Sequence, residues 1–244
     1  MPPVDIQREI VAEFDAIAAQ IDSLDKNIEQ LDVDIKNKFA ELFGDSQHGY
    51  KYPFDSFGNF VYVKGGDTFK EKYQGSKNSD DIPFYKVSDM NSECNERIMN
   101  VSNNYVSETT LLNEIKASIF DVGTIIFPKV GMAIKTNKKR ILGRRAAVDN
   151  NTMAIWRKND SLNNEYLYAF LNFCVDLSNI ANNANPPSIN AANFNRTQIM
   201  VPPIELQEKF ALYVENCELM KESARARRSE LIIERSELVK KYFR

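Results

Sequence analysis

The chain has 244 residues, of which 43% are hydrophobic and 27% charged, a composition typical of one large globular domain or two small ones. A formal net charge of −3 and a sequence pI of about 5.5 argue against a protein that coats nucleic acid indiscriminately, but they leave room for a local basic face. Three widely spaced cysteines are typical of free thiols in a reducing compartment, and the single histidine, His48, argues against a histidine-based metal site or a Ser/His/Asp triad.

Neither a long apolar run nor a basic-then-apolar leader is visible, so we expect a cytoplasmic protein without a membrane span.

The two ends of the chain repeat one pattern at a constant offset. Pro2-Pro3 matches Pro202-Pro203, and the segments VDIQ and IELQ follow them. The register holds over about 44 residues, which indicates two copies of one structural element.

The first copy, residues 1–44, predicts one long helix. No Pro or Gly interrupts residues 4–43, and the segment holds ten acidic and only four basic side chains. Apolar residues recur at alternating steps of four and three, the heptad pattern that keeps one stripe facing a partner helix. The predicted seam comprises Ile17, Ile21, Leu24, Ile28, Leu31 and Ile35.

Residues 45–200 change character, because helical periodicity largely disappears and Asn becomes abundant. Short strand-like runs bounded by Gly, Pro, Asn and Asp lie at 58–66, 82–90, 123–134 and 144–156. Helices are predicted at 107–118 and 163–181. The pattern predicts a mixed α/β domain between two long helices.

The segment 128–145 holds seven basic residues and no acidic one. Residues 136–139, Thr-Asn-Lys-Lys, are typical of the tip of a β-hairpin. Such a concentration of positive charge in an acidic protein suggests an anionic partner, most simply DNA phosphates, although solvated surface charge is the plainer alternative. The predicted contacts here are Lys129, Lys135, Thr136, Asn137, Lys138, Lys139, Arg140, Arg144 and Arg145.

Two other polar stretches are candidates for base contacts. Lys86, Ser88 and Asn91 follow the strand-like run that begins at residue 82. Asn190 and Arg196 lie in the Asn-rich segment 181–203, where amide and guanidinium side chains suit base edges. The alternative for SINAANF, which begins at Ser188, is a capped short helix.

The second copy, residues 201–244, also predicts a helix, with Cys217, Ala224, Leu231 and Leu238 on its stripe. Lys221, Arg228 and Arg235 interrupt that stripe. This copy is more basic than the first, so the two helices suit each other as partners. Packing of each helix on the central domain alone is the other interpretation.

No catalytic or metal-binding constellation is present in the sequence. NPPS at 185–188 is similar to the motif of amino-methyltransferases, but Ser188 stands where an aromatic residue would stack on the base. VGMAIKT at 130–136 lacks the two glycines of a phosphate-binding loop.

The order long helix, mixed domain, long helix resembles the specificity subunit of type I restriction–modification enzymes. QIMVPPIELQEKF at 198–210 is similar to that family's junction between recognition domain and conserved helix, and GTIIFPKVG and IPFYKVSDM resemble its recurrent strands. The full-length family has two recognition domains and two such helices, so this chain resembles a half-length form with one target recognition domain, either natural or a piece of a longer subunit.

The resemblance implies an α/β (α+β) target recognition domain at 45–200, flanked by two long α-helices that form an antiparallel coiled coil. It implies sequence-specific binding to one half of a split double-stranded DNA target and docking of methyltransferase subunits, with a motor-nuclease subunit joining the assembly. The chain itself would be non-catalytic, with S-adenosylmethionine and ATP on partner subunits only. A homodimer would read an inverted repeat. The alternatives are a coiled-coil interaction scaffold and the recognition fragment of a fused single-chain restriction enzyme.

Overall fold

The computed structural model describes residues 3–243, so Met1, Arg244 and Pro2 of the predicted repeat lie outside the described residues. The chain divides into two compact units. We call Met1–Leu42 with Lys209–Arg244 the helix pair and Phe43–Glu208 the central domain.

Two helices of 40 residues each open and close the described chain, α1 (Val4–Phe43) and α6 (Ile204–Phe243). Each begins directly after a proline whose carbonyl oxygen accepts a hydrogen bond from a glutamine amide, Gln7 on Pro3 and Gln207 on Pro203. A proline suits this entrance because the first turn of a helix has no use for its missing amide. The prediction of two matched long helices is confirmed.

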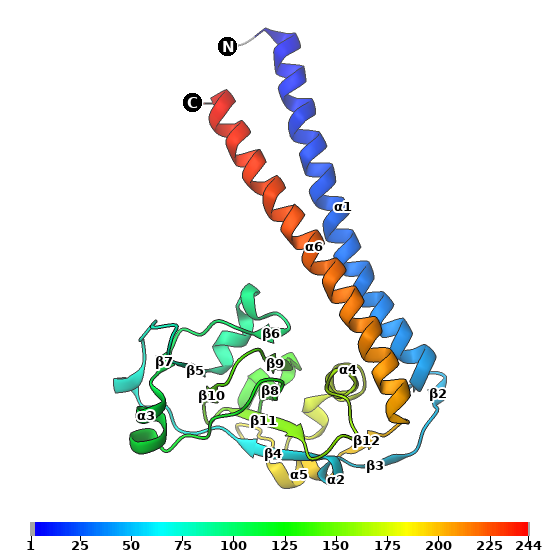
Figure 1. Cartoon of the computed structure of the whole chain (residues 1–244), viewed down its shortest axis with the longest axis vertical. Helices are drawn as coiled ribbons and strands as arrows, with labels where there is room; N and C mark the ends of the chain where they lie inside the picture. Colours follow the sequence, from blue (N-terminus) through cyan, green and yellow to red (C-terminus); the bar gives the residue numbers. More distant parts are fainter. Residues whose placement is uncertain (1–2, 244) are drawn as a thin grey trace. The chain divides into compact units, whose positions relative to one another are not determined.

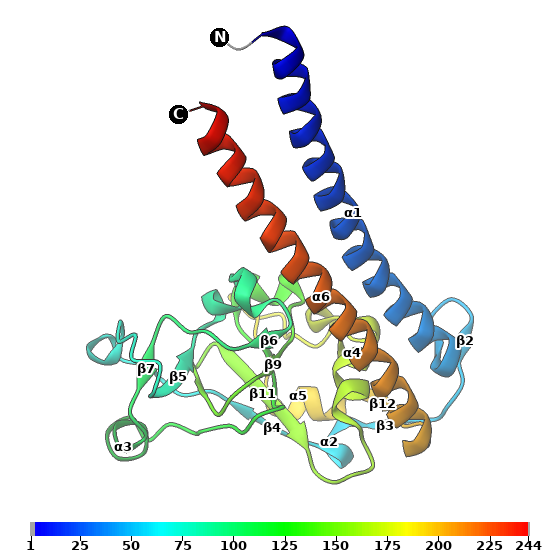
Figure 2. The same ribbon diagram turned by 45° about the horizontal axis from the view of Figure 1, so that its top comes forward.

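The helix pair is antiparallel and forms within one chain (Figures 1 and 2). Near the end of α1, Phe39 packs edge-on against Phe210 of α6 with ring centroids 5.6 Å apart. Near its start, Glu13 accepts a hydrogen bond from the Tyr242 hydroxyl at 3.1 Å. The end of α1 therefore lies beside the start of α6, and the start of α1 beside the end of α6. This arrangement confirms the predicted antiparallel coiled coil.

All ten predicted seam residues are buried or partly buried. Ile17, Ile35, Cys217 and Leu231 are buried, and Ile21, Leu24, Ile28, Leu31, Ala224 and Leu238 are half-buried. Two of the three basic residues predicted to interrupt the stripe, Lys221 and Arg228, are buried or half-buried in the seam. Lys221 is 3% exposed, with its ammonium group 2.6 Å from Asp32, and Arg228 lies 2.6 Å from Asp25. These charged residues therefore interrupt the apolar stripe at seam positions, as the sequence predicts, and α1 supplies a carboxylate partner for each of them.

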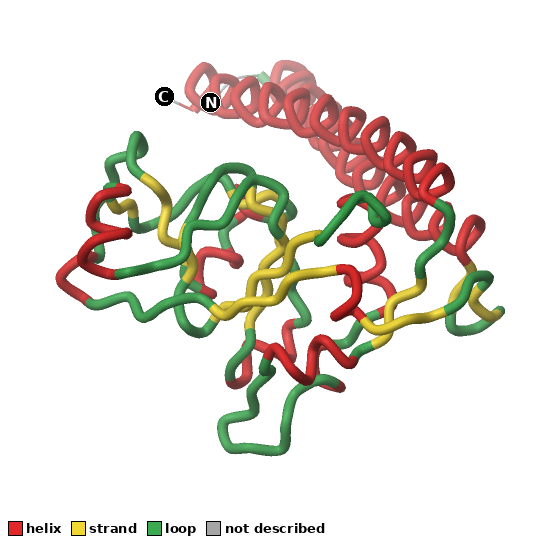
Figure 3. Tube along the Cα trace, turned by 60° about the horizontal axis from the view of Figure 1, so that its bottom comes forward, coloured by secondary structure: helices red, strands yellow, loops and turns green. Residues whose placement is uncertain are grey.

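The central domain consists of short strands joined by turns and loops (Figure 3). Its strands are β1 (Gly44–Asp45), β2 (Gly49–Tyr50), β3 (Phe54–Ser56), β4 (Val61–Gly65), β5 (Ile82–Tyr85), β6 (Ile98–Met99), β7 (Tyr105–Val106), β8 (Ile125–Pro128), β9 (Arg140–Leu142), β10 (Ala147–Val148), β11 (Thr152–Arg157) and β12 (Gln198–Met200). Its α-helices are α2 (Phe57–Phe60), α3 (Glu108–Thr110), α4 (Asn164–Cys174) and α5 (Ala191–Arg196).

The largest sheet has the order β4-β11-β8-β9-β6, with the parallel pair β6–β9 at one edge and antiparallel neighbours elsewhere. A three-stranded sheet has the order β10-β5-β7, and two-stranded sheets join β1 to β2 and β3 to β12. All four strand-like runs of the sequence contain strands. The α/β prediction for the domain is confirmed.

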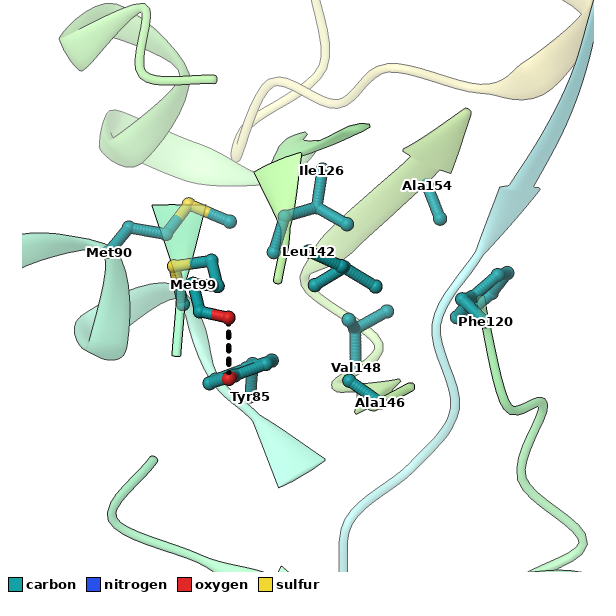
Figure 4. Close-up of a cluster of buried hydrophobic side chains, with 9 residues drawn as sticks. All are labelled: Tyr85, Met90, Met99, Phe120, Ile126, Leu142, Ala146, Val148 and Ala154. Atoms are coloured by element: carbon teal, nitrogen blue, oxygen red, sulfur yellow. Dashed lines mark hydrogen bonds between the residues drawn. The ribbon is translucent and has the colours of Figure 1, made fainter. Parts of the chain in front are cut away.

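One buried cluster packs between the two larger sheets (Figure 4). Ile126, Leu142 and Ala154 come from the five-stranded sheet, and Tyr85 and Val148 come from the three-stranded one. The Tyr85 hydroxyl donates to the Met99 carbonyl oxygen at 3.0 Å, so its polar end is satisfied inside the core. Strands β8 and β10 are buried at every residue, as expected for strands that are covered on both faces.

Both predicted internal helices are shorter than expected. The segment 107–118 forms α3 and a π-helical turn at Leu111–Ile115, ending at Lys116 with φ of 58°. In 163–181, α4 ends at Cys174 because Val175 is extended, and a separate 3₁₀ turn follows at Leu177–Asn179. Asp176 caps that turn by accepting from the Ser178 amide.

Candidate nucleic-acid interface

The basic stretch connects two antiparallel neighbours of the main sheet, β8 and β9. We call residues 129–139 the β8–β9 connection. Its tip differs from the predicted tight hairpin, because Gly131–Thr136 winds into a 3₁₀ helix that ends at Asn137 with φ of 53°. Thr136 is exposed, and its hydroxyl donates to the Ala133 carbonyl oxygen at 2.7 Å. The connection is therefore a compact turn with internal hydrogen bonds.

The structure brings two of the predicted polar segments together. Lys138 on the connection donates to the Asn91 side-chain oxygen at 2.5 Å. Arg140 at the start of β9 donates to the Met90 carbonyl oxygen at 3.1 Å and to the Lys139 carbonyl oxygen at 2.9 Å. Residues Val87–Asn91 form a 3₁₀ turn that leaves the Ser88 and Asn91 side chains exposed. We call Lys135, Lys138, Arg140, Ser88 and Asn91 the cationic cluster.

The cations of this cluster have no acidic partner among residues 3–243. Lys135 is exposed without an ion pair, Lys138 bonds to an amide oxygen, and Arg140 bonds only to carbonyl oxygens. The nearby carboxylate of Asp89 is buried and accepts from the Lys86 amide and the Asn103 side chain. Lys138 and Arg140 contact the turn that exposes Ser88 and Asn91, and Lys135 is exposed on the same connection. Positive charges without acidic partners together with exposed hydroxyl and amide side chains suit a nucleic acid, with its phosphates and polar base edges.

Lys139 requires a correction, because the structure buries it completely. Its ammonium group donates to the Asn137 side-chain oxygen and to the Val175 carbonyl oxygen, each at 2.7 Å. Burial lowers the pKa of Lys139 to about 8, opposed only in part by Asp176. The interpretation of Lys139 as a phosphate contact is therefore wrong in this structure. The Asn137 side-chain amide likewise forms hydrogen bonds inside the protein, with Val175, Leu177 and Lys139.

The remaining predicted cations differ in how far they are neutralised. Arg145 pairs with Glu108 at 2.9 Å and lies 3.7 Å from Asp121, so its charge is compensated. Arg144 donates to the carbonyl oxygens of Ser79 and Asp81, each at 3.1 Å. These contacts turn both arginines toward α3 and the loop before β5. Carboxylates therefore compensate the charge of Arg145, whereas Arg144, like Arg140, has no acidic partner among the described residues. Arg144 is left out of the cationic cluster because its contacts are with the loop before β5 and not with the turn Val87–Asn91.

Lys86 is half-buried and donates to the Gln74 side-chain oxygen at 3.0 Å. Lys129 lies against the backbone of the Asn-rich segment, where its carbonyl oxygen accepts from the Ile189 amide at 2.8 Å. The two polar stretches 128–145 and 181–203 are thus neighbours at this point. Sequence reasoning did not predict their contact.

Asn190 and Arg196 lie at the two ends of α5. The Asn190 side chain caps the helix by accepting from the Asn193 amide at 2.8 Å, as the alternative for this segment predicted. Arg196 is exposed at the end of the helix, which packs against α2 and β4. Both side chains reach solvent, but neither has a described contact with the cationic cluster.

A cavity of about 670 Å³ lies beside β4 and β11 and was not predicted. Trp156 and Phe120 form its apolar wall, and Lys64 and Asp160 contribute charges of both signs. Within residues 3–243 no cluster of His, Cys, Asp and Glu could hold a metal ion. No described helix is both long and apolar enough to cross a membrane.

The type I restriction modification DNA specificity domain is the family whose model matches this chain, over residues 54–231, and the chain belongs to that family. The matched residues include the cationic cluster and more than half of α6. No curated protein sequence matches the chain significantly.

The chain is also similar in fold to three solved structures of type I restriction–modification proteins. The HsdS subunit from Thermoanaerobacter tengcongensis has a TM-score of 0.57 at 14% identity, covering 99% of this chain and 59% of that chain. The type I restriction-modification system S subunit from M. genitalium has a TM-score of 0.63 at 15% identity, covering 96% and 60%. A chain from a study of complex assembly and conformational transition of the type I R-M system has a TM-score of 0.61 at 14% identity, covering 100% and 60%. The present chain thus spans about three fifths of each of these proteins.

Proposed function

We propose that this chain is a DNA-specificity component of a type I restriction–modification enzyme and that its central domain reads one half of a split target. The cationic cluster carries the proposal. Lysine and arginine charges without acidic partners can neutralise DNA phosphates and release counterions. Ser88 and Asn91 beside them can bond to base edges, which is how sequence is distinguished.

The helix pair then sets the distance between half-sites and docks methyltransferase subunits. Leu212, Leu219 and Ile233 support a docking role, because each is more than half exposed and they recur at multiples of seven residues. They lie two positions after Phe210, which packs on Phe39 of α1, and after the seam residues Cys217 and Leu231, hence on the opposite side of α6. An exposed apolar stripe of this kind favours a partner helix over solvent.

The chain supplies recognition without chemistry in this proposal. S-adenosylmethionine and ATP belong to the methyltransferase and motor-nuclease partners. Two copies of the chain, or one copy joined to a second recognition domain, would read both halves of the target and gain affinity from linkage.

A salt titration of DNA binding tests the role of the cationic cluster. The double variant Lys135→Ala/Lys138→Ala should flatten the slope of log affinity against log salt by roughly 2, about one per lost phosphate contact. The variant Lys36→Ala/Lys240→Ala removes two exposed charges from the helices and is the matched control. Equal slopes in both variants would show that bulk charge, and not the cluster, governs binding.

Methylation sequencing of cells that carry the chain with its methyltransferase partner tests the whole proposal. A new methylated motif should appear and should vanish with Leu219→Ser, which disrupts the proposed docking stripe but leaves the cationic cluster intact. Absence of any new motif with the unaltered chain would favour the interaction-scaffold alternative.

A further inference from the structure

Two residues of the β8–β9 connection point into the protein and bind the link between α4 and the following 3₁₀ turn. The Lys139 ammonium group donates to the carbonyl oxygen of Val175 at 2.7 Å. The Asn137 amide nitrogen donates to the same oxygen at 3.4 Å, and the Asn137 oxygen accepts from the Leu177 amide at 3.0 Å. The connection is therefore tied to a segment nearly 40 residues further along the chain.

The two side chains also bond to each other, since the Lys139 ammonium group donates to the Asn137 oxygen at 2.7 Å. Asn137 adopts φ of 53°, a left-handed conformation that asparagine tolerates better than most residues. Its own amide donates to the Ile134 carbonyl oxygen at 3.0 Å, which closes the 3₁₀ helix. Backbone conformation and side-chain bonds at Asn137 support the same turn.

Burial of Lys139 is costly, because its ammonium group loses water and has no carboxylate within hydrogen-bonding distance among the described residues. A methionine would fill a similar volume without this cost. What the lysine adds is a pair of strong, directional hydrogen bonds from a charged donor. Those bonds fix the chain at the position directly after Lys138, whose side chain points to Asn91 instead.

We propose that Asn137 and Lys139 are positioning residues for DNA recognition, which hold the β8–β9 connection so that Lys138 and Lys135 face the nucleic acid, and that neither touches DNA. This inference rests on the proposed function. It divides the basic stretch into contact residues and internal supports, a distinction that the run of lysines in the sequence conceals.

The variants Lys138→Met and Lys139→Met make a matched pair, because they remove the same group from adjacent positions. Both are titrated with a fluorescently labelled duplex of mixed sequence over a range of salt concentrations. Lys138→Met should reduce the salt slope by about 1. Lys139→Met should leave the slope unchanged but weaken binding roughly tenfold, as expected if the binding-competent connection falls to about a tenth of molecules.

Hydrogen exchange supplies a readout that does not depend on DNA. Amides in residues 134–139 and 175–178 should exchange faster in Lys139→Met and at the normal rate in Lys138→Met. Asn137→Gly keeps the left-handed backbone and removes the side-chain amide. It should show the weaker binding and faster exchange expected of Lys139→Met, and it tests the positioning role independently if Lys139→Met folds poorly.

The outcomes separate this inference from the proposed function. A slope reduced equally by both methionine variants would place Lys139 on a phosphate and overturn its positioning role. Normal affinity and normal exchange in Lys139→Met, with Lys138→Met behaving as expected, would overturn the positioning role alone. An unchanged slope in Lys138→Met would instead refute the phosphate contact of Lys138, and with it the positioning role proposed for its neighbours Asn137 and Lys139.

Discussion

Lys221 places a positive charge inside the seam of the helix pair. Its replacement by glutamate reverses that charge and tests how much the ion pairs of Lys221 contribute to stability. Its side chain is 4% exposed, and its ammonium group lies 2.6 Å from Asp32 and 2.8 Å from Glu218. Lys221→Glu would place a third carboxylate between these two. At an effective dielectric of about 20, one pair of unit charges about 4 Å apart is worth roughly 4 kcal/mol. Because Asp32 is 62% exposed and screened by water, we expect a loss of about 3 kcal/mol.

Urea unfolding followed by far-UV circular dichroism measures this loss through the helical signal. Lys221→Met is the control and should stay within about 1 kcal/mol of the unaltered chain, because an apolar side chain of similar length suits a seam. The swap Asp32→Lys/Lys221→Glu should recover more than half of the loss. The reasoning fails if Lys221→Glu proves as stable as Lys221→Met, since the charge would then not lie between the two carboxylates.

Two further predictions concern the central domain. Burial lowers the pKa of Lys139 to about 8, so between that pH and the ordinary lysine range the unfolded chain binds more protons than the folded one. The free energy of unfolding should therefore rise with pH, by about 2 to 3 kcal/mol relative to Lys139→Met between about pH 7 and pH 10, and parallel pH curves would contradict the burial of this charge. A Cβ at Gly66 would lie 2.2 Å from the Asp149 carbonyl oxygen and 2.3 Å from that of Val148, so Gly66→Ala should cost more than about 2 kcal/mol in thermal unfolding. Gly65→Ala is its control, because there the only obstacle is the flexible end of Lys129; equal losses would refute the clash.

The two long helices were predictable from the sequence because their signals are local, although the predicted segments 1–44 and 201–244 exceed the observed helices by a few residues. An uninterrupted heptad stripe and a Pro-Pro entrance define Val4–Phe43, and the repeat transfers the same bounds to Ile204–Phe243. Short strands were located for a similar reason, since Gly, Pro, Asn and Asp bound each apolar run. Internal helices were overestimated at their ends, where Val175 turns extended within an otherwise helical pattern.

For the candidate site, the sequence predicts only that basic residues are concentrated in one segment, and not which of them are exposed. The sequence places seven basic residues in 128–145, but it does not distinguish exposed Lys135 from fully buried Lys139. It also does not show that Arg145 pairs with Glu108, 37 residues away. Whether a basic side chain is exposed, buried or paired depends on which distant segment packs beside it.

What the sequence by itself determined is the order of parts, two matched helices around one mixed domain with a local concentration of positive charge. Periodicity and composition are properties of neighbouring residues, so they can be read without the fold. Only the tertiary structure decided which charges are free, because desolvation and pairing depend on contacts across long separations, such as Lys221 with Asp32 and Lys139 with Val175.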